Sequence, residues 1–123
     1  MLAKGIAWTT LVLGVVHIVF GIIKFKVPLA EAVSAGFIDQ FIGDAARREA
    51  FWFLSCGPFL MLMGHIAIRA VSAGDRAVLK VMGLYVLGAS LVSVAAFPTS
   101  PLWSLLVLSL LLFAAGNTRD MAD

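Results

Sequence analysis

Charge is what this sequence has least of. Only 13% of its 123 residues are Asp, Glu, Lys or Arg, whereas 62% are hydrophobic. Soluble domains average about 25% charged and about 45–50% apolar residues, so this composition is typical of a membrane protein. The mean hydropathy of +1.05 indicates the same class. No basic cluster with interleaved aromatic residues accompanies the net charge of +2, and we therefore expect no nucleic-acid partner.

Cysteine is also nearly absent. Cys56 is the single cysteine, so no disulfide can form within the chain, and a thiol in an apolar run is usually inert. No C-x-x-C-H motif for covalent haem occurs.

The first apolar run lacks the carboxylate that a proton-coupled small multidrug exporter needs in its first membrane helix. The sequence does not identify a cofactor.

The sequence instead contains several long apolar runs. A membrane-spanning helix needs about 20 apolar residues, because the hydrocarbon core is about 30 Å thick. The first run is longer than the core of a signal peptide, which is about 7–15 residues. We predict an all-α fold of one integral membrane domain (1–123), a four-transmembrane-helix bundle with helices near 5–23, 47–71, 76–97 and 102–116.

A polar interruption at 25–48 is too long for a tight turn. Pro28 suits the first turn of a helix, and apolar residues recur at helical spacing as far as Phe37. We predict a short amphipathic helix that lies in the membrane interface and breaks near Gly36 or Gly43.

Small and polar residues form stripes along the first two runs. They recur at helical spacing as Thr10, Gly14, His17, Gly21 and Lys24 in the first run, and as Ala50, Gly57 and Gly64 in the second. Such a stripe lies on one helix face. In lipid, that face packs closely on another helix and holds polar side chains inward. We therefore expect His17 to face the interior of the bundle.

His17 is the main candidate for a functional group, because ionisable residues inside membranes usually serve a function. Counted at about 1.5 Å per residue, Glu49 enters the membrane from the side nearest His17. The two are the candidate catalytic residues, as a general acid–base pair. Two alternatives stay open: His17 as a neutral histidine bonded to a neighbouring helix, and Glu49 as the ion-pair partner of Lys24 or Arg47.

Further residues are predicted to line an apolar ligand pocket around His17. These candidate ligand-binding residues are Trp52, Phe53, Tyr85, Thr99 and Trp103. The alternative for the aromatic run at 51–53 is an interfacial belt. His65 would lie about 13 Å from His17 along the helix axes, which disfavours a shared haem or metal ion. We predict no metal site, and haem held by one histidine stays open.

Basic residues give a slight preference for one membrane orientation. The side of both termini carries five of them, and the other side carries four: Lys4, Arg69, Arg76, Lys80 and Arg119 against Lys24, Lys26, Arg47 and Arg48. By the positive-inside rule both termini are expected in the cytoplasm.

Three segments carry a resemblance to a known family. They are G-V-V-H-I-V-F-G at Gly14–Gly21, R-R-E-A-F-W-F-L-S-C-G-P-F-L-M-L-M-G at Arg47–Gly64 and P-T-S-P-L-W at Pro98–Trp103. In these segments the chain resembles an uncharacterised bacterial family, a domain of unknown function. The family tends to have Ser-Gly before the aromatic residue of its last helix, and this chain has Ser100-Pro101-Leu102. The resemblance implies a four-helix protein of the bacterial inner membrane, with no assigned activity. The architecture is also similar to small DoxX-like proteins, which carries no function.

Three functions fit these features. The first is binding of a lipid-like or quinone-like apolar small molecule near His17. The second is a membrane-embedded isomerase or hydrolase-like enzyme that uses His17 with Glu49. The third is an accessory or structural subunit whose stripes of small residues dock a partner or a second copy in a homo-oligomer. Membrane lipids are expected partners in each case.

Overall fold

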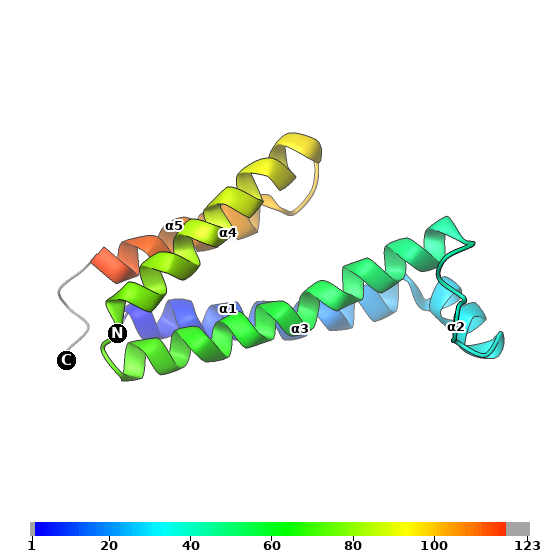
Figure 1. The fold of residues 1–123 in the computed structure, drawn as a ribbon, viewed down its shortest axis with the longest axis horizontal. Helices are drawn as coiled ribbons and strands as arrows, with labels where there is room; N and C mark the ends of the chain where they lie inside the picture. The colour runs from blue at the N-terminus through cyan, green and yellow to red at the C-terminus, as the bar shows by residue number, and fades with distance from the viewer. Residues whose placement is uncertain (1, 118–123) are drawn as a thin grey trace. The chain divides into compact units, whose positions relative to one another are not determined.

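The computed structural model describes residues 2–117. Over this range the chain is all-α, with no strand and five helices: α1 (Leu2–Lys24), α2 (Lys26–Ser34), α3 (Ala45–Ser72), α4 (Arg76–Ala96) and α5 (Trp103–Asn117) (Figure 1). The helices fall into two compact units. We call Leu11–Leu62 the central unit, and Met1–Thr10 with Met63–Asp123 the terminal unit. Arg119, which contributes to the charge count of the terminal side, lies outside the described residues.

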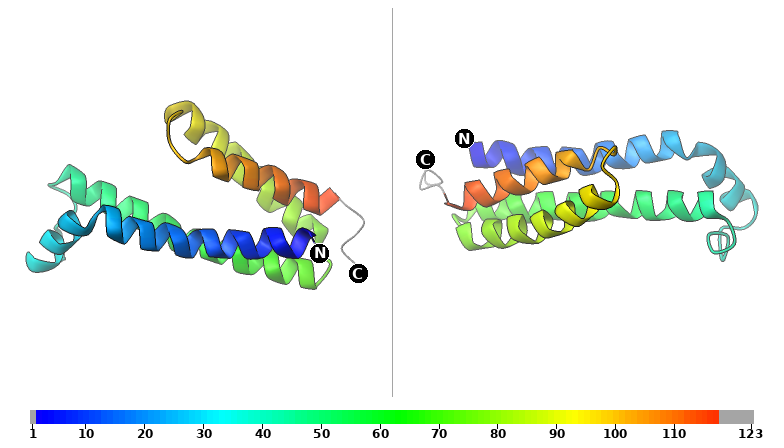
Figure 2. Two further views of the ribbon diagram at one scale, coloured as in Figure 1. Left: turned by 180° about the vertical axis from the view of Figure 1, so that it is seen from behind. Right: turned by 90° about the horizontal axis from the view of Figure 1, so that it is seen from above.

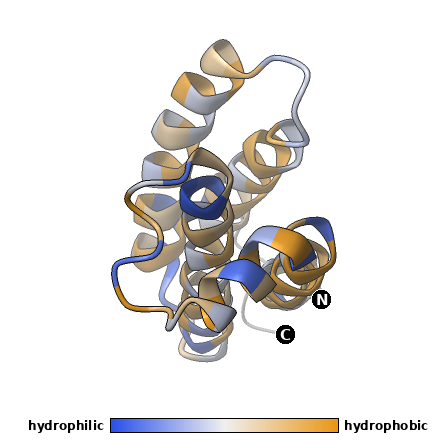
Figure 3. Cartoon of the chain, turned by 90° about the vertical axis from the view of Figure 1, so that its right-hand side faces the viewer, coloured by the Kyte–Doolittle hydropathy of each residue, from blue (hydrophilic) through white to orange (hydrophobic). Residues whose placement is uncertain are grey.

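Three helices are long and apolar enough to cross a membrane: α1, α3 and α4, with 23, 28 and 21 residues. The apolar α5 is shorter, with 15 residues. Its length is about 22 Å at 1.5 Å per residue, less than the hydrocarbon core of about 30 Å. Figure 3, a cartoon coloured by hydropathy, shows apolar residues along most of the helices.

In the central unit, α1 and α3 pack through glycine. A Cβ atom built on Gly14 would lie 2.7 Å from the backbone nitrogen of Met61 and 2.9 Å from the carbonyl oxygen of Gly57. A Cβ atom on Gly57 would collide with the side chain of Ile18. Gly14 and Gly57 belong to the two stripes of small residues, so the prediction that these stripes mark close helix packing is confirmed at this point.

Helix α2 follows α1 directly, and a glycine, Gly36, lies just beyond its end. Gly36 has a φ of +101°, its N–H donates to Val33 O (3.1 Å), and the N–H of Phe37 donates to Ala32 O (2.8 Å). These two bonds form a Schellman motif, which needs a left-handed residue just beyond the helix. The short helix predicted between the first two long ones is thus present, and it breaks at Gly36 rather than at Gly43.

Arg47 ties α2 and its following loop to the start of α3. Its guanidinium lies 3.6 Å from the Glu31 carboxylate and donates to Gln40 Oε1 at 3.3 Å. Its backbone N–H donates to Asp44 Oδ1 at 2.8 Å. Asp44 therefore caps the first turn of α3, where backbone donors have no helical acceptor. The connection at 35–44 is held by side chains although it contains no helix.

In the terminal unit, α4 and α5 lie side by side (Figures 1 and 2). A Cβ atom on Gly83 would lie 2.6 Å from the backbone nitrogen of Phe113. One on Gly116 would lie 2.9 Å from the backbone nitrogen of Lys80. The backbones of the two helices therefore approach closely at both glycines.

The turn from α3 into α4 has the same kind of helix end as α2, a glycine with a positive φ just beyond the last helical turn. Gly74 has a φ of +67°, and the N–H of Asp75 donates to Ala70 O at 2.8 Å, as in a Schellman motif. The Asp75 carboxylate then accepts from Val78 N at 3.1 Å and caps α4. One aspartate thus ends the turn and begins the next helix.

Candidate functional site

His17 is joined to the backbone of α3 by a hydrogen bond. Its Nε2 atom lies 2.9 Å from the carbonyl oxygen of Phe53. A carbonyl oxygen only accepts, so Nε2 must carry the hydrogen and donate it. In the neutral ring, Nδ1 then holds a lone pair. No protein group within the described range bonds to Nδ1, so this nitrogen keeps an unused acceptor there.

The His17 ring also stacks on the ring of Phe53. The centroids are 4.1 Å apart and the planes differ by 11°. Gly21, one turn further along α1, makes room for this ring, because a Cβ atom there would lie 2.9 Å from Phe53 Cδ1. The ring centroids of Phe25 and Phe20 lie 5.3 and 6.1 Å from that of Phe53. His17 is therefore half-buried beside an aromatic cluster of Phe20, Phe25 and Phe53.

Glu49 pairs with Lys24 at the end of this cluster. The ammonium of Lys24 lies 3.6 Å from the Glu49 carboxylate, with 46% and 64% of the two side chains exposed. The same ammonium lies 4.6 Å from the Phe25 ring centroid and 5.4 Å from that of Phe53, within cation–π range. No hydrogen bond joins His17 to Glu49, both of which the structure describes. Glu49 thus pairs with Lys24, which is one of the two ion-pair partners predicted for it.

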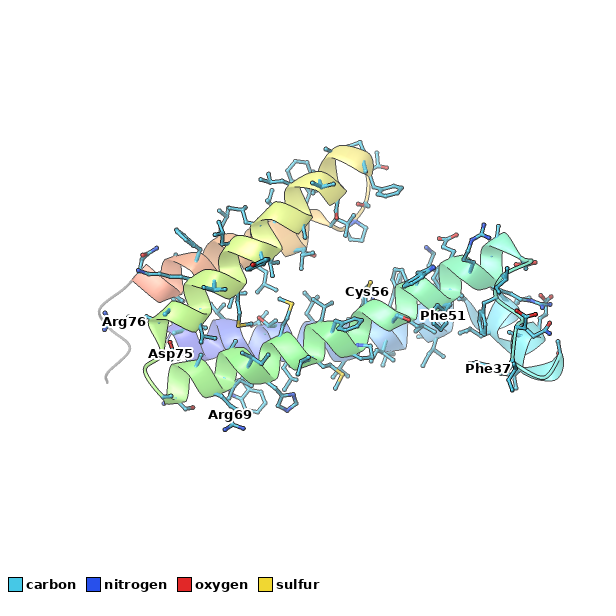
Figure 4. All side chains as sticks on the ribbon, viewed as in Figure 1. Phe37, Phe51, Cys56, Arg69, Asp75 and Arg76 are labelled. Atoms are coloured by element: carbon cyan, nitrogen blue, oxygen red, sulfur yellow. The ribbon has the colours of Figure 1, made fainter. Side chains whose placement is uncertain are left out.

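Trp52 and Phe53 were both candidates for the wall of the pocket. Phe53 is the one that contacts His17. Trp52 is 64% exposed, and its nearest ring is that of Phe51, at 5.5 Å and nearly perpendicular. Figure 4 shows Phe51 and Cys56 on this part of α3. Cys56 is exposed rather than enclosed by protein.

Tyr85, Thr99 and Trp103 belong to the terminal unit, and their grouping with His17 stays a prediction. Trp103 donates from Nε1 to Pro98 O at 2.9 Å, within the turn before α5. Thr99 is exposed in the same turn. Tyr85 is 77% exposed on α4.

A shallow depression of about 380 Å³ adjoins Tyr85. Its lining residues all come from α4: Leu84, Tyr85, Gly88 and Ala89. One helix face cannot enclose a ligand. The depression therefore gives Tyr85 an open surface rather than a pocket.

Phe25 is the member of the site that the sequence did not reveal. It is 6% exposed, and its ring centroid lies 4.6 Å from the Lys24 ammonium and 5.3 Å from the Phe53 ring centroid. The available signal was an apolar aromatic residue directly after the last basic residue of a membrane helix. Among residues 2–117, no group of three or more His, Cys, Asp or Glu side chains is placed to hold a metal ion.

The fold and the site define a class of small, helical, predominantly apolar proteins with a histidine between two helices of membrane-spanning length. The chain belongs to the family of unknown function DUF6463, whose model matches residues 1–119. No curated protein and no solved structure matches the chain. The predicted membership of an uncharacterised family is thereby confirmed.

Proposed function

We propose that this protein is a small integral membrane protein that binds a lipid-like or quinol-like molecule beside His17. In this proposal α1, α3, α4 and α5 form the predicted bundle of four membrane-spanning helices, in a bacterial inner membrane with both termini in the cytoplasm. The short α5 would cross with local thinning of the bilayer. The connecting α2 would lie in the interface.

Exposed apolar side chains support the membrane location. Large apolar residues of α1 are about half exposed or more along its length: Val12, Val16, Val19, Phe20, Ile22 and Ile23. Soluble monomers rarely expose apolar patches larger than a few hundred Å². Lipid chains would cover these side chains without any other partner.

The hydrogen bond from His17 to Phe53 is the observation that carries the proposal. It leaves Nδ1 as an acceptor at the edge of an aromatic cluster. An acceptor selects a ligand that donates, such as the hydroxyl of a quinol, an alcohol or a protonated fatty acid. An oxidised quinone offers only carbonyl oxygens and cannot donate to Nδ1. The neutral site is therefore expected to prefer a quinol to its quinone.

The two alternative functions have less support. A general acid–base pair needs His17 and Glu49 within reach of the same substrate atoms, but each contacts a different partner. In the accessory-subunit alternative, a stripe of small residues has to be free to pack against a partner. The space beside Gly14 and Gly57 is already occupied by the contact between the chain's own helices α1 and α3. Binding at His17 uses groups that these contacts leave available.

Two substitutions of His17 separate ligand binding from helix packing. In His17→Gln, the amide nitrogen is as many bonds from Cα as Nε2, so the bond to Phe53 O can persist while the Nδ1 acceptor is lost. In His17→Asn, the amide oxygen is as many bonds from Cα as Nδ1, so the acceptor can persist while the bond to Phe53 O is lost.

The measurement is binding of a short-tailed benzoquinol and its quinone to the protein in mild detergent, together with native mass spectrometry of molecules retained from the membrane. We expect the wild type to bind the quinol about tenfold more tightly, the equivalent of about one hydrogen bond. His17→Gln should lose this preference and His17→Asn should retain part of it. Equal binding by wild type and His17→Gln would refute the site.

A further inference from the structure

A second, smaller groove lies at the end of the terminal unit, between the start of α1 and the end of α3. Its lining residues are Lys4 and Trp8 from α1, and Ile68 and Ser72 from α3. Each pair is spaced by four residues, so each helix contributes two side chains from adjacent turns of one face. The groove holds about 260 Å³, below the range of about 300–1,000 Å³ that is usual for pockets holding a whole drug-sized ligand.

The polar atoms of this groove favour an anion. Lys4 is exposed, and its ammonium has no carboxylate partner among the described residues. The indole N–H of Trp8, which is 55% exposed, likewise has no acceptor there. The Ser72 hydroxyl already donates to Ile68 O at 2.9 Å. The lining therefore combines two donors without a partner among the described residues with the apolar Ile68 side chain and indole ring.

Basic residues outnumber carboxylates in the described part of the unit that contains the groove. The described part of the terminal unit contains four basic residues, Lys4, Arg69, Arg76 and Lys80, against one carboxylate, Asp75. That carboxylate is already engaged in capping α4. Arg69, Asp75 and Arg76 lie around the turn between α3 and α4 (Figure 4). An anion at this end gains attraction from several cations and meets little repulsion.

We infer that the groove binds the headgroup of an anionic phospholipid. Lys4 and the Trp8 N–H donate to the phosphate oxygens, while the acyl chains leave the groove along the apolar face of α1. Tryptophan and lysine at a helix end match the level of lipid headgroups. A free phosphate would gain nothing from Ile68 or the indole ring, which favours a lipid. The inference rests on the membrane location proposed above and is independent of the ligand at His17.

The first test removes one charge from the groove. Native mass spectrometry of the protein released from nanodiscs compares retained phosphatidylglycerol with phosphatidylcholine of the same acyl chains. The wild type should retain phosphatidylglycerol preferentially, and Lys4→Gln should lower its retention about fivefold, the contribution of one basic contact at a membrane surface. The matched control is Lys26→Gln, which removes the same charge from an exposed lysine of the central unit and should change little.

The second test fills the groove without changing charge. Ser72→Leu should also lower phosphatidylglycerol retention. Its matched control is Ser34→Leu, because both serines are the last residue of a helix, are exposed and donate to a carbonyl of their own helix, Ser34 to Glu31 O at 3.0 Å. Circular dichroism of all four variants checks that the helices persist.

Three outcomes would overturn the inference. The first is equal loss of phosphatidylglycerol in Lys4→Gln and Lys26→Gln, which would mean general charge attraction. The second is unchanged retention in Ser72→Leu, and the third is displacement of the lipid by millimolar inorganic phosphate. A protein that fails to enter nanodiscs at all would instead refute the membrane location, so the two failures are distinguishable.

Discussion

The two units of this chain differ in their balance of basic and acidic residues. The described central unit has four basic and four acidic residues. Two ion pairs, Lys24–Glu49 and Arg47–Glu31, each connect one helix of this unit to another. The described terminal unit has four basic residues against one carboxylate. The central unit thus satisfies much of its charge internally, whereas the terminal unit presents an excess of cations. That difference is why we propose different ligands for the two units.

Helix packing also differs between the units. In the central unit, α1 and α3 meet through glycines, a histidine and an aromatic cluster. In the terminal unit, α4 and α5 meet through Gly83 and Gly116, with fully buried Leu79, Leu112, Ser90 and Ser109. Ser90 and Ser109 each donate to a carbonyl of their own helix, at 3.0 and 2.6 Å. The buried serines of the α4–α5 pair therefore bond within their own helices, whereas His17 of α1 bonds to the backbone of α3.

The largest effect is expected from Gly57→Leu. A side chain at Gly57 meets Ile18 and the Gly14 backbone, and overpacking of this kind costs about 1–3 kcal/mol or more. We expect loss of the α1–α3 pairing, measured by denaturant titration in detergent. Gly88→Leu is the matched control, since a Cβ atom there meets nothing within 4 Å. Equal stability of the two variants would contradict the close packing.

Phe53→Leu should have an intermediate effect. It removes the stack on His17 and the cation–π contact with Lys24, which together contribute about 1–2 kcal/mol. The matched control is Phe20→Leu, because the Phe20 ring is 54% exposed and 6.1 Å from that of Phe53. Thermal unfolding should separate the two variants by several degrees. If Phe20→Leu is the more harmful change, the cluster is not centred on Phe53.

Glu49→Gln should have the smallest effect. The Lys24–Glu49 pair is largely exposed, and such pairs contribute about 0–1 kcal/mol. The difference in unfolding free energy from wild type should shrink further in high salt, because exposed charges are screened. A loss of several kcal/mol that persists in high salt would show that Glu49 has a role beyond this pair. Unchanged ligand binding would separate it from His17.

The apolar runs and stripes predicted the helices and their close packing, because both follow directly from helical periodicity. Periodicity could not decide which residue of Phe51, Trp52 and Phe53 meets His17, since three consecutive side chains point in three directions. Gly21 decides it, because its missing side chain leaves room for the ring of Phe53. That role is visible only once α1 and α3 are placed together.

The partners of the charged residues were less predictable. The sequence offered Lys24 and Arg47 as alternatives for Glu49, and the course of α2 settles the question. Helix α2 brings Glu31 to Arg47, which leaves Lys24 for Glu49. The sequence does not predict the groove at Lys4 and Trp8, because its two halves are 64 residues apart, Lys4 to Ile68. Only the pairing of α1 with α3 joins them.

The bond from His17 to the Phe53 carbonyl has a consequence for protonation. A second proton can be gained only at Nδ1, because Nε2 already carries its hydrogen and points it at α3. The doubly protonated ring would keep that bond and would face the Phe53 ring as a cation. The contact between α1 and α3 therefore uses one ring nitrogen and leaves the other outside it, so chemistry at Nδ1 does not require the two helices to separate.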